Sequence, residues 1–158
     1  MSFLSRSTAP PRPKTRNTWL VSLLLAAFFV VMIVGQLFTF EDFPAVLDTM
    51  WIPLSEAWLP VVASVIVTFE VLALPFLLGL RLSVAMRVLS MVFGWLAILT
   101  WLVFSLGNSL RGDMANSGFL GTTIVLPAGW WTVLFCVALG ILAAWVAWGM
   151  WPLARPKK

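Results

Sequence analysis

Glu70 is the residue whose type and position most strongly suggest chemistry, because it is the one charge in the apolar run at residues 58–80. At about 1.5 Å per helical residue it lies roughly 15 Å from the end of that run. An ionised carboxylate at this depth costs several kcal/mol unless it is paired or takes up a proton. Glu70 is therefore a candidate proton carrier or ligand contact. The structural alternative is a protonated acid bonded to a neighbouring helix, through the turn at Thr68 or through Thr100.

A second group of polar residues gathers near one end of the apolar runs. Its members are Gln36, Ser105, Asn108, Ser109, Arg111 and Asp113. Ser105 lies three residues before Asn108 and four before Ser109, and both spacings place side chains on one helical face. The group is expected either to bond helices together at a solvated helix end or to line a shallow cavity.

The stretch LRGDMANSGFLGTTIVLPAGWW, residues 110–131, is a long segment that is neither a chain end nor an apolar run. It contains S-G-F-L-G at residues 117–121, in which glycine permits backbone angles that other residues resist. The segment is either a working site or a turn.

The residue types that are missing exclude much enzyme chemistry. The chain has no His and no Tyr, which removes His-ligated haem, most zinc sites and Ser–His or Cys–His nucleophile pairs. The single cysteine, Cys136, lies in an apolar run, is expected in the core and has no partner for an intramolecular disulfide. We expect no cofactor and no bound metal.

The composition indicates that lipid is the solvent of this protein. Of its 158 residues, 61% are hydrophobic and 10% are charged, whereas soluble domains have about 25% charged residues. Four runs reach the length of roughly 20 apolar residues that a spanning helix needs. They predict an all-α, polytopic membrane protein: one four-helix bundle at residues 18–152 with helices at about 18–40, 58–80, 88–110 and 129–151.

Charge placement predicts the orientation of the bundle in the bilayer. All basic residues except Arg111 lie before the first run, between the second and third, or after the fourth. The positive-inside rule then places both termini in the cytoplasm and the loops at 41–57 and 111–128 outside, as in a bacterial inner membrane. The net charge of +4 follows from this topology, so no nucleic-acid partner is expected.

The segments outside the four runs have simple predicted roles. Residues 1–17 form a Pro-rich basic tail that is expected to be disordered in the cytoplasm, and residues 153–158 form a second basic tail. Pro44 suits the start of a short amphipathic helix in the membrane interface, which Pro53 would end. In the last run, Gly140, Ala144 and Ala147 form a strip of small residues suited to close helix contact. Trp95 and Trp101 lie deeper than the other tryptophans and are predicted to be packing residues.

Four passages resemble the MauE/DoxX-like family of small four-helix bacterial membrane proteins, and most closely its MauE branch. They are FEDFPAVLDTMWIPL after the first helix, FEVLALPFLLGL around Glu70, SLRG ending at Gly112, and SGFLG. SGFLG falls where the MauE branch has C-G-C-F-G. In that alignment Ser117 and Phe119 replace the two cysteines, while Gly118 and Gly121 match the glycines.

The resemblance implies a link with thiol–disulfide transfer across the membrane, which in the MauE branch serves the maturation of methylamine dehydrogenase. Disulfide exchange needs a thiolate, and neither Ser117 nor Phe119 supplies one. We therefore expect a non-enzymatic, or no longer enzymatic, subunit or assembly factor of a membrane or periplasmic protein complex. Its contacts are expected at Glu70, Arg111 and the second outer loop.

Two other hypotheses stay open. The first is a small transporter or binder of a lipid-like or quinone-like ligand that uses Glu70 and the outer polar group. The second is a redox enzyme that borrows thiols from a partner through Cys136. The sequence also leaves open whether copies of the chain associate with one another.

Overall fold

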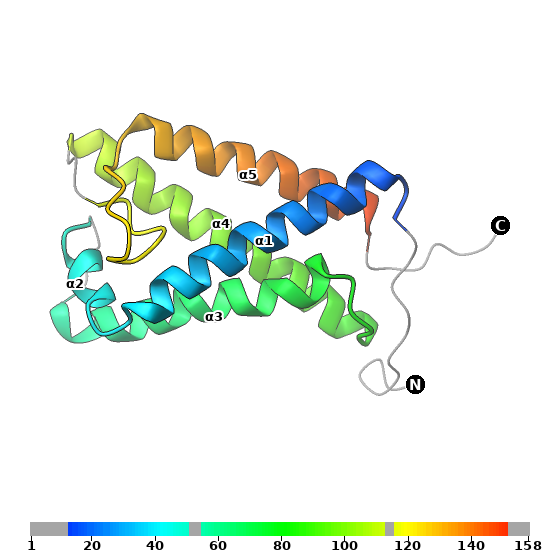
Figure 1. Cartoon of the computed structure of the whole chain (residues 1–158), viewed down its shortest axis with the longest axis horizontal. Helices are drawn as coiled ribbons and strands as arrows, with labels where there is room; N and C mark the ends of the chain where they lie inside the picture. The colour runs from blue at the N-terminus through cyan, green and yellow to red at the C-terminus, as the bar shows by residue number, and fades with distance from the viewer. Residues whose placement is uncertain (1–12, 51–54, 113–115, 152–158) are drawn as a thin grey trace.

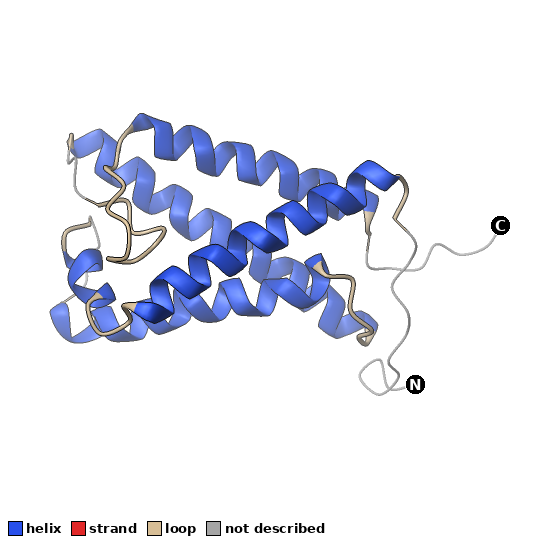
Figure 2. Ribbon diagram, viewed as in Figure 1, coloured by secondary structure: helices blue, strands red, loops and turns tan. Residues whose placement is uncertain are grey.

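In a computed structural model, residues 13–50, 55–112 and 116–151 are described, and these residues fold into helices joined by short loops (Figure 2). The elements in chain order are α1 (Arg16–Phe38), α2 (Phe43–Asp48), the 3-10 helix η1 (Glu56–Trp58), α3 (Leu59–Leu77), α4 (Val84–Arg111) and α5 (Trp130–Gly149). No strand occurs in the described ranges apart from a single bridge between Asn116 and Pro127.

Four of these helices are long and apolar enough to cross a membrane: α1, η1 with α3, α4 and α5. The prediction of an all-α fold with four helices long and apolar enough to span a membrane is thereby confirmed. The third span starts four residues earlier than the expected residue 88, at Val84. The reason is Ser83, whose hydroxyl accepts a hydrogen bond from the backbone nitrogen of Met86 at 3.3 Å and so caps the first turn of α4.

The four long helices close a bundle in which each packs on two others. α3 packs against α4, α4 against α5, α5 against α1, and α1 against α3 (Figure 1). The short turn between α3 and α4 makes them antiparallel neighbours, as its length predicts. Large apolar side chains, among them Leu25, Phe29, Met32, Ile66 and Val146, fill the centre with almost no exposure.

Both described chain ends lie at one end of the bundle, which we call the terminal end (Figure 1). The backbone nitrogen of Lys14 donates to the carbonyl of Gly149 at 3.1 Å, and the Lys14 ammonium lies 3.5 Å from the centre of the Trp148 ring. Lys14 therefore contacts α5. α1 begins at Arg16, two residues before the expected start at residue 18. Residues 1–12 and 152–158 lie outside the described ranges.

The opposite end, which we call the loop end, holds α2 and residues 116–128 (Figure 1). Pro44 occupies the first turn of α2, as expected from the sequence. The apolar side of α2 faces the bundle, because Phe43 and Leu47 are fully buried and α2 packs on α3. The helix thus belongs to the protein core at the loop end. Trp51 and Pro53 lie outside the described residues.

α5 approaches α1 tightly at Gly149, near the end of α5. A Cβ atom added to Gly149 would collide with the side chain of Thr18, which is fully buried. A Cβ atom added to Gly140 would meet only Ile98, at 3.9 Å, which is an ordinary van der Waals distance. The two glycines of α5 therefore offer a matched comparison.

We expect Gly149→Ala to lower the thermal stability of the protein in detergent, because the added methyl group pushes on Thr18 in a packed interface. Overpacking of this kind costs about 1–3 kcal/mol. Gly140→Ala is the control and should be neutral or slightly stabilising, since alanine favours a helix. Equal melting temperatures for the two variants would contradict the proposed helix contact.

Candidate functional site

Glu70 is fully buried and is held by side chains from two other helices. Its Oε1 atom accepts a hydrogen bond from the Trp101 indole nitrogen of α4 at 2.7 Å and another from the Gln36 amide nitrogen of α1 at 3.2 Å. Gln36 is also fully buried, and Trp101 is nearly so. These three residues, which we call the Glu70 cluster, join α1, α3 and α4.

The partner of Glu70 on α4 is Trp101 and not the neighbouring Thr100. The Thr100 hydroxyl donates to the Leu96 carbonyl of its own helix at 2.8 Å. Thr68 likewise donates to Ser64, at 2.7 Å. Consecutive helical residues point about 100° apart, so only one of Thr100 and Trp101 can face α3. Trp101 is buried and packs on aromatic rings, as predicted, and its indole nitrogen is in addition a polar contact of the cluster.

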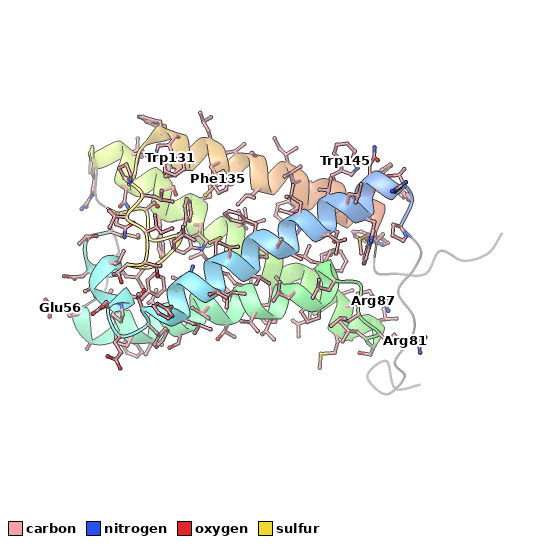
Figure 3. All side chains as sticks on the ribbon, in the orientation of Figure 1. Glu56, Arg81, Arg87, Trp131, Phe135 and Trp145 are labelled. Atoms are coloured by element: carbon pink, nitrogen blue, oxygen red, sulfur yellow. The ribbon has the colours of Figure 1, made fainter. Side chains whose placement is uncertain are left out.

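The S-G-F-L-G segment is attached directly to the Glu70 cluster. The Gln36 amide nitrogen donates a second hydrogen bond, to the Phe119 carbonyl at 3.1 Å. The Phe119 ring is almost completely buried, with its centre 5.0 Å from that of Trp101 and 5.7 Å from that of Phe135. Figure 3 shows Phe135 and Trp131 on the part of α5 that adjoins this segment. Phe119 thus packs at the loop end of the bundle, next to the Glu70 cluster.

Asn116 organises the segment from its start, which the sequence analysis missed. Its side-chain oxygen accepts from the backbone nitrogens of Gly118 and Leu126, at 3.2 and 3.3 Å. Its side-chain nitrogen donates to the Gly121 carbonyl at 2.8 Å. The signal was present in the sequence, because an asparagine side chain commonly bonds the backbone two residues on, and Gly118 is two residues after Asn116. Gly118 and Gly121 adopt positive φ angles of 74° and 59°, as turn glycines do.

Thr39, at the end of α1, anchors the other side of the segment. Its hydroxyl accepts from the Thr122 backbone nitrogen at 3.1 Å and donates to the Gly35 carbonyl at 3.2 Å. The Thr123 hydroxyl donates to the same carbonyl at 3.1 Å. A Cβ atom at Gly35 would lie only 3.1 Å from the Leu120 backbone. The absence of a side chain at Gly35 therefore lets residues 116–128, which we call the re-entrant loop, rest on α1.

The remaining predicted polar residues do not join the Glu70 cluster. Ser105 is buried and lies 3.8 Å from the sulfur of Cys136 on α5, and Asn108 is also buried, one turn further along α4. Arg111 is exposed at the end of α4. Asp113 lies outside the described residues. Ser105, Asn108 and Arg111 thus form a series along α4, whereas Gln36 belongs with Glu70.

Two buried oxygen atoms of the cluster have no hydrogen-bond partner among the described residues. They are Oε2 of Glu70 and Oε1 of Gln36. Both atoms are hydrogen-bond acceptors when Glu70 is ionised, so each of them lacks a hydrogen-bond donor. A proton on Glu70 supplies one donor and removes a buried charge. The described residues contain no group of three or more acidic, Cys or His side chains that could hold a metal ion. The cluster offers hydrogen bonding and a carboxyl group that can take up a proton.

Ser117 and Phe119, which the resemblance aligns with two cysteines, are both buried. Ser117 has 5% of its surface exposed and its hydroxyl oxygen has no partner in the described ranges, while Phe119 is 2% exposed. The chain's own thiol, Cys136, is 1% exposed. A thiol from a second protein would have to enter the packed bundle to reach any of these positions.

Comparisons with protein-family models, curated proteins and solved structures find no match to this chain. The resemblance to the MauE/DoxX-like family therefore stays a prediction from the motifs.

We expect Glu70→Leu to destabilise the protein by roughly 1–3 kcal/mol, because it leaves the Trp101 indole and one hydrogen of the Gln36 amide buried without an acceptor. Glu70→Gln keeps the shape and an acceptor oxygen, so its melting temperature in detergent should stay close to that of the wild type. Trp101→Phe, which removes only one of the donors to Glu70, should fall between the two. A loss with Glu70→Gln as large as with Glu70→Leu would show that the negative charge itself is required.

Proposed function

We propose that this protein is a MauE/DoxX-like membrane protein that acts as a non-catalytic subunit or assembly factor of a membrane-associated complex, with its loop end as the contact surface. The observation that carries the proposal is the re-entrant loop. Its S-G-F-L-G segment keeps the turn glycines, but Ser117 and Phe119 stand at the positions of the motif cysteines and are buried beside the Glu70 cluster. Such a loop supplies a fixed surface and no thiol.

The proposed orientation places the loop end on the outer face of a bacterial inner membrane. Arg81 and Arg87 lie at the terminal end and Glu56 lies at the loop end (Figure 3). This separation of charge matches the positive-inside rule when the terminal end faces the cytoplasm. The partner surface would then be presented to the periplasm.

The tip of the re-entrant loop has the character of a contact surface. Ile124 and Val125 are 52% and 70% exposed, although the loop that carries them is tied to α1 and to Asn116. Because the base of the loop is ordered, binding at its tip costs little conformational entropy. Exposed acidic side chains lie at the same end of the bundle (Figure 1 and Figure 3): Glu41, Asp42, Asp48 and Glu56. We expect the partner to offer an apolar recess to the loop tip and basic residues to the acidic side chains.

A second candidate function is binding of a small quinone-like or lipid-like ligand at the cluster. The observation that favours it is the pair of unpartnered acceptors, Glu70 Oε2 and Gln36 Oε1, which a ligand hydroxyl could satisfy. Under this hypothesis Glu70→Gln changes ligand retention while the protein stays folded. The complex-subunit hypothesis expects no such ligand.

A photo-crosslinking amino acid at Val125 should form a discrete adduct with another protein in native membranes. The reason is that Val125 projects from an ordered loop at the proposed contact surface. The control is the same amino acid at Leu24, which is 62% exposed in the middle of α1 and faces lipid in the proposed arrangement. The measurement is gel mobility followed by mass spectrometry of the adduct.

The proposed function requires a defined protein partner at Val125 that is absent at Leu24, and Val125→Asp should reduce its co-purification. Adducts to lipid alone at both positions would contradict the complex-subunit hypothesis. A copy of the same chain as the only adduct would redirect the proposal to self-association.

Cys136→Ala should leave partner association and any thiol exchange in the membrane unchanged, because the thiol is buried against Ser105. A membrane-permeant maleimide should label Cys136 only after denaturation. The surface control is Val125→Cys, which should be labelled in the folded protein. Loss of a mixed disulfide with the partner in Cys136→Ala would instead support the borrowed-thiol hypothesis.

A further inference from the structure

A groove of about 390 Å³ lies on the outside of the bundle between α3 and α4, away from the Glu70 cluster. It runs from Leu82 and Met86, near the terminal end, to Phe93 on α4. The Phe93 ring, which lines the groove, has its centre 5.5 Å from that of the Phe69 ring on α3. At about 1.5 Å per helical residue, the α4 wall from Met86 to Phe93 is roughly 10 Å long.

The groove exists because α3 and α4 touch on one side and carry bulky side chains on the other. The Ser90 hydroxyl of α4 donates to the Leu72 carbonyl at 2.5 Å and accepts from the Phe76 backbone nitrogen at 3.0 Å. Gly94 faces Ala73 closely on the same side of α4. Leu72 and Leu89 remain 39% and 46% exposed and form the walls. The groove therefore lies beside this helix contact, and Pro75 of α3 is one of the residues that line it.

The chemistry of the walls selects a hydrocarbon occupant. All residues that line the groove are apolar except Ser90, and the hydroxyl of Ser90 is already bonded to the α3 backbone. A ligand with polar groups along its length would find no hydrogen-bond partner there and would lose its hydration. An acyl chain has no hydrogen-bonding groups and therefore loses no hydration when it enters the groove.

The mouth of the groove is positively charged. Arg81 is exposed and directly precedes the groove residue Leu82, and the guanidinium of Arg87 donates to the Leu82 carbonyl at 3.2 Å. Figure 3 shows both arginines at this end of the bundle. The exposed acidic side chains of the described residues, Glu41, Asp42, Asp48 and Glu56, lie towards the loop end (Figure 1 and Figure 3). Arg87 is 4% exposed, so the exposed guanidinium of Arg81 is the cation that a phosphate at the mouth would meet.

We propose that this groove is a binding site for an anionic phospholipid, with one acyl chain between α3 and α4 and the phosphate at Arg81. Basic pockets between transmembrane helices are known to hold anionic headgroups. The site is separate from the proposed partner surface at the opposite end of the bundle, so either proposal can fail without the other.

The test is reconstitution of the full chain into nanodiscs that contain equal amounts of phosphatidylglycerol and phosphatidylcholine with identical acyl chains. The protein is then released in mild detergent, and retained lipids are counted by native mass spectrometry. We expect one phosphatidylglycerol to be retained in excess. Arg81→Gln should reduce its excess over phosphatidylcholine about fivefold, the factor that about 1 kcal/mol per basic side chain gives. Leu89→Trp, which fills the groove, should remove the retained lipid.

Matched controls separate the site from general effects of charge and bulk. Arg16→Gln removes an exposed charge at the same end of the bundle, and Leu96→Trp adds the same bulk to an exposed position of the same helix outside the groove. Both controls should retain the lipid as the wild type does. Equal retention of the two lipids by the wild type, or equal losses in variants and controls, would overturn the proposal. Unchanged melting temperatures in both tryptophan variants confirm that folded protein is compared.

Discussion

A carboxyl group cannot lie in an apolar helix bundle without partners, and the loop end of this protein is arranged around that constraint at Glu70. Desolvation of an unpaired acid costs more than most single contacts return. Trp101 and Gln36 each bring a donor from a different helix to the same carboxyl oxygen. Gln36 then uses its second hydrogen for the Phe119 carbonyl. One buried acid thus sets how α1, α3, α4 and the re-entrant loop lie relative to one another.

This arrangement also explains how the re-entrant loop is held in place. The loop is fixed by its backbone and by Asn116, Thr39 and the Gln36 amide, none of which depends on a thiol. Phe119 adds ring contacts with Trp101 and Phe135. A loop held in this way is rigid, which suits the proposed role as a contact surface.

The sequence predicts the four spans because helix length and apolar content are set locally by the bilayer. It also identifies Glu70, whose charge stands out among apolar neighbours. It cannot choose between Thr100 and Trp101 as the partner of Glu70, because that choice depends on how α4 is rotated against α3. The packing of Gly149 on Thr18 is hidden for the same reason: a tight contact between helices depends on their crossing point. The contact of Lys14 with α5 is made by a backbone bond to Gly149, which no local pattern encodes.

Pro75 raises the question of whether α3 bends beneath Glu70, because a proline leaves the carbonyl four residues earlier, that of Val71, without its usual donor. The helix nevertheless continues to Leu77. Ser90 of α4 bonds the Leu72 carbonyl and the Phe76 nitrogen, which brackets the proline with interhelical hydrogen bonds. These bonds hold α3 against α4 near Glu70. They join the same two helices as the hydrogen bond between Trp101 and Glu70. The same serine that forms the floor of the groove therefore also supports the geometry of the buried cluster.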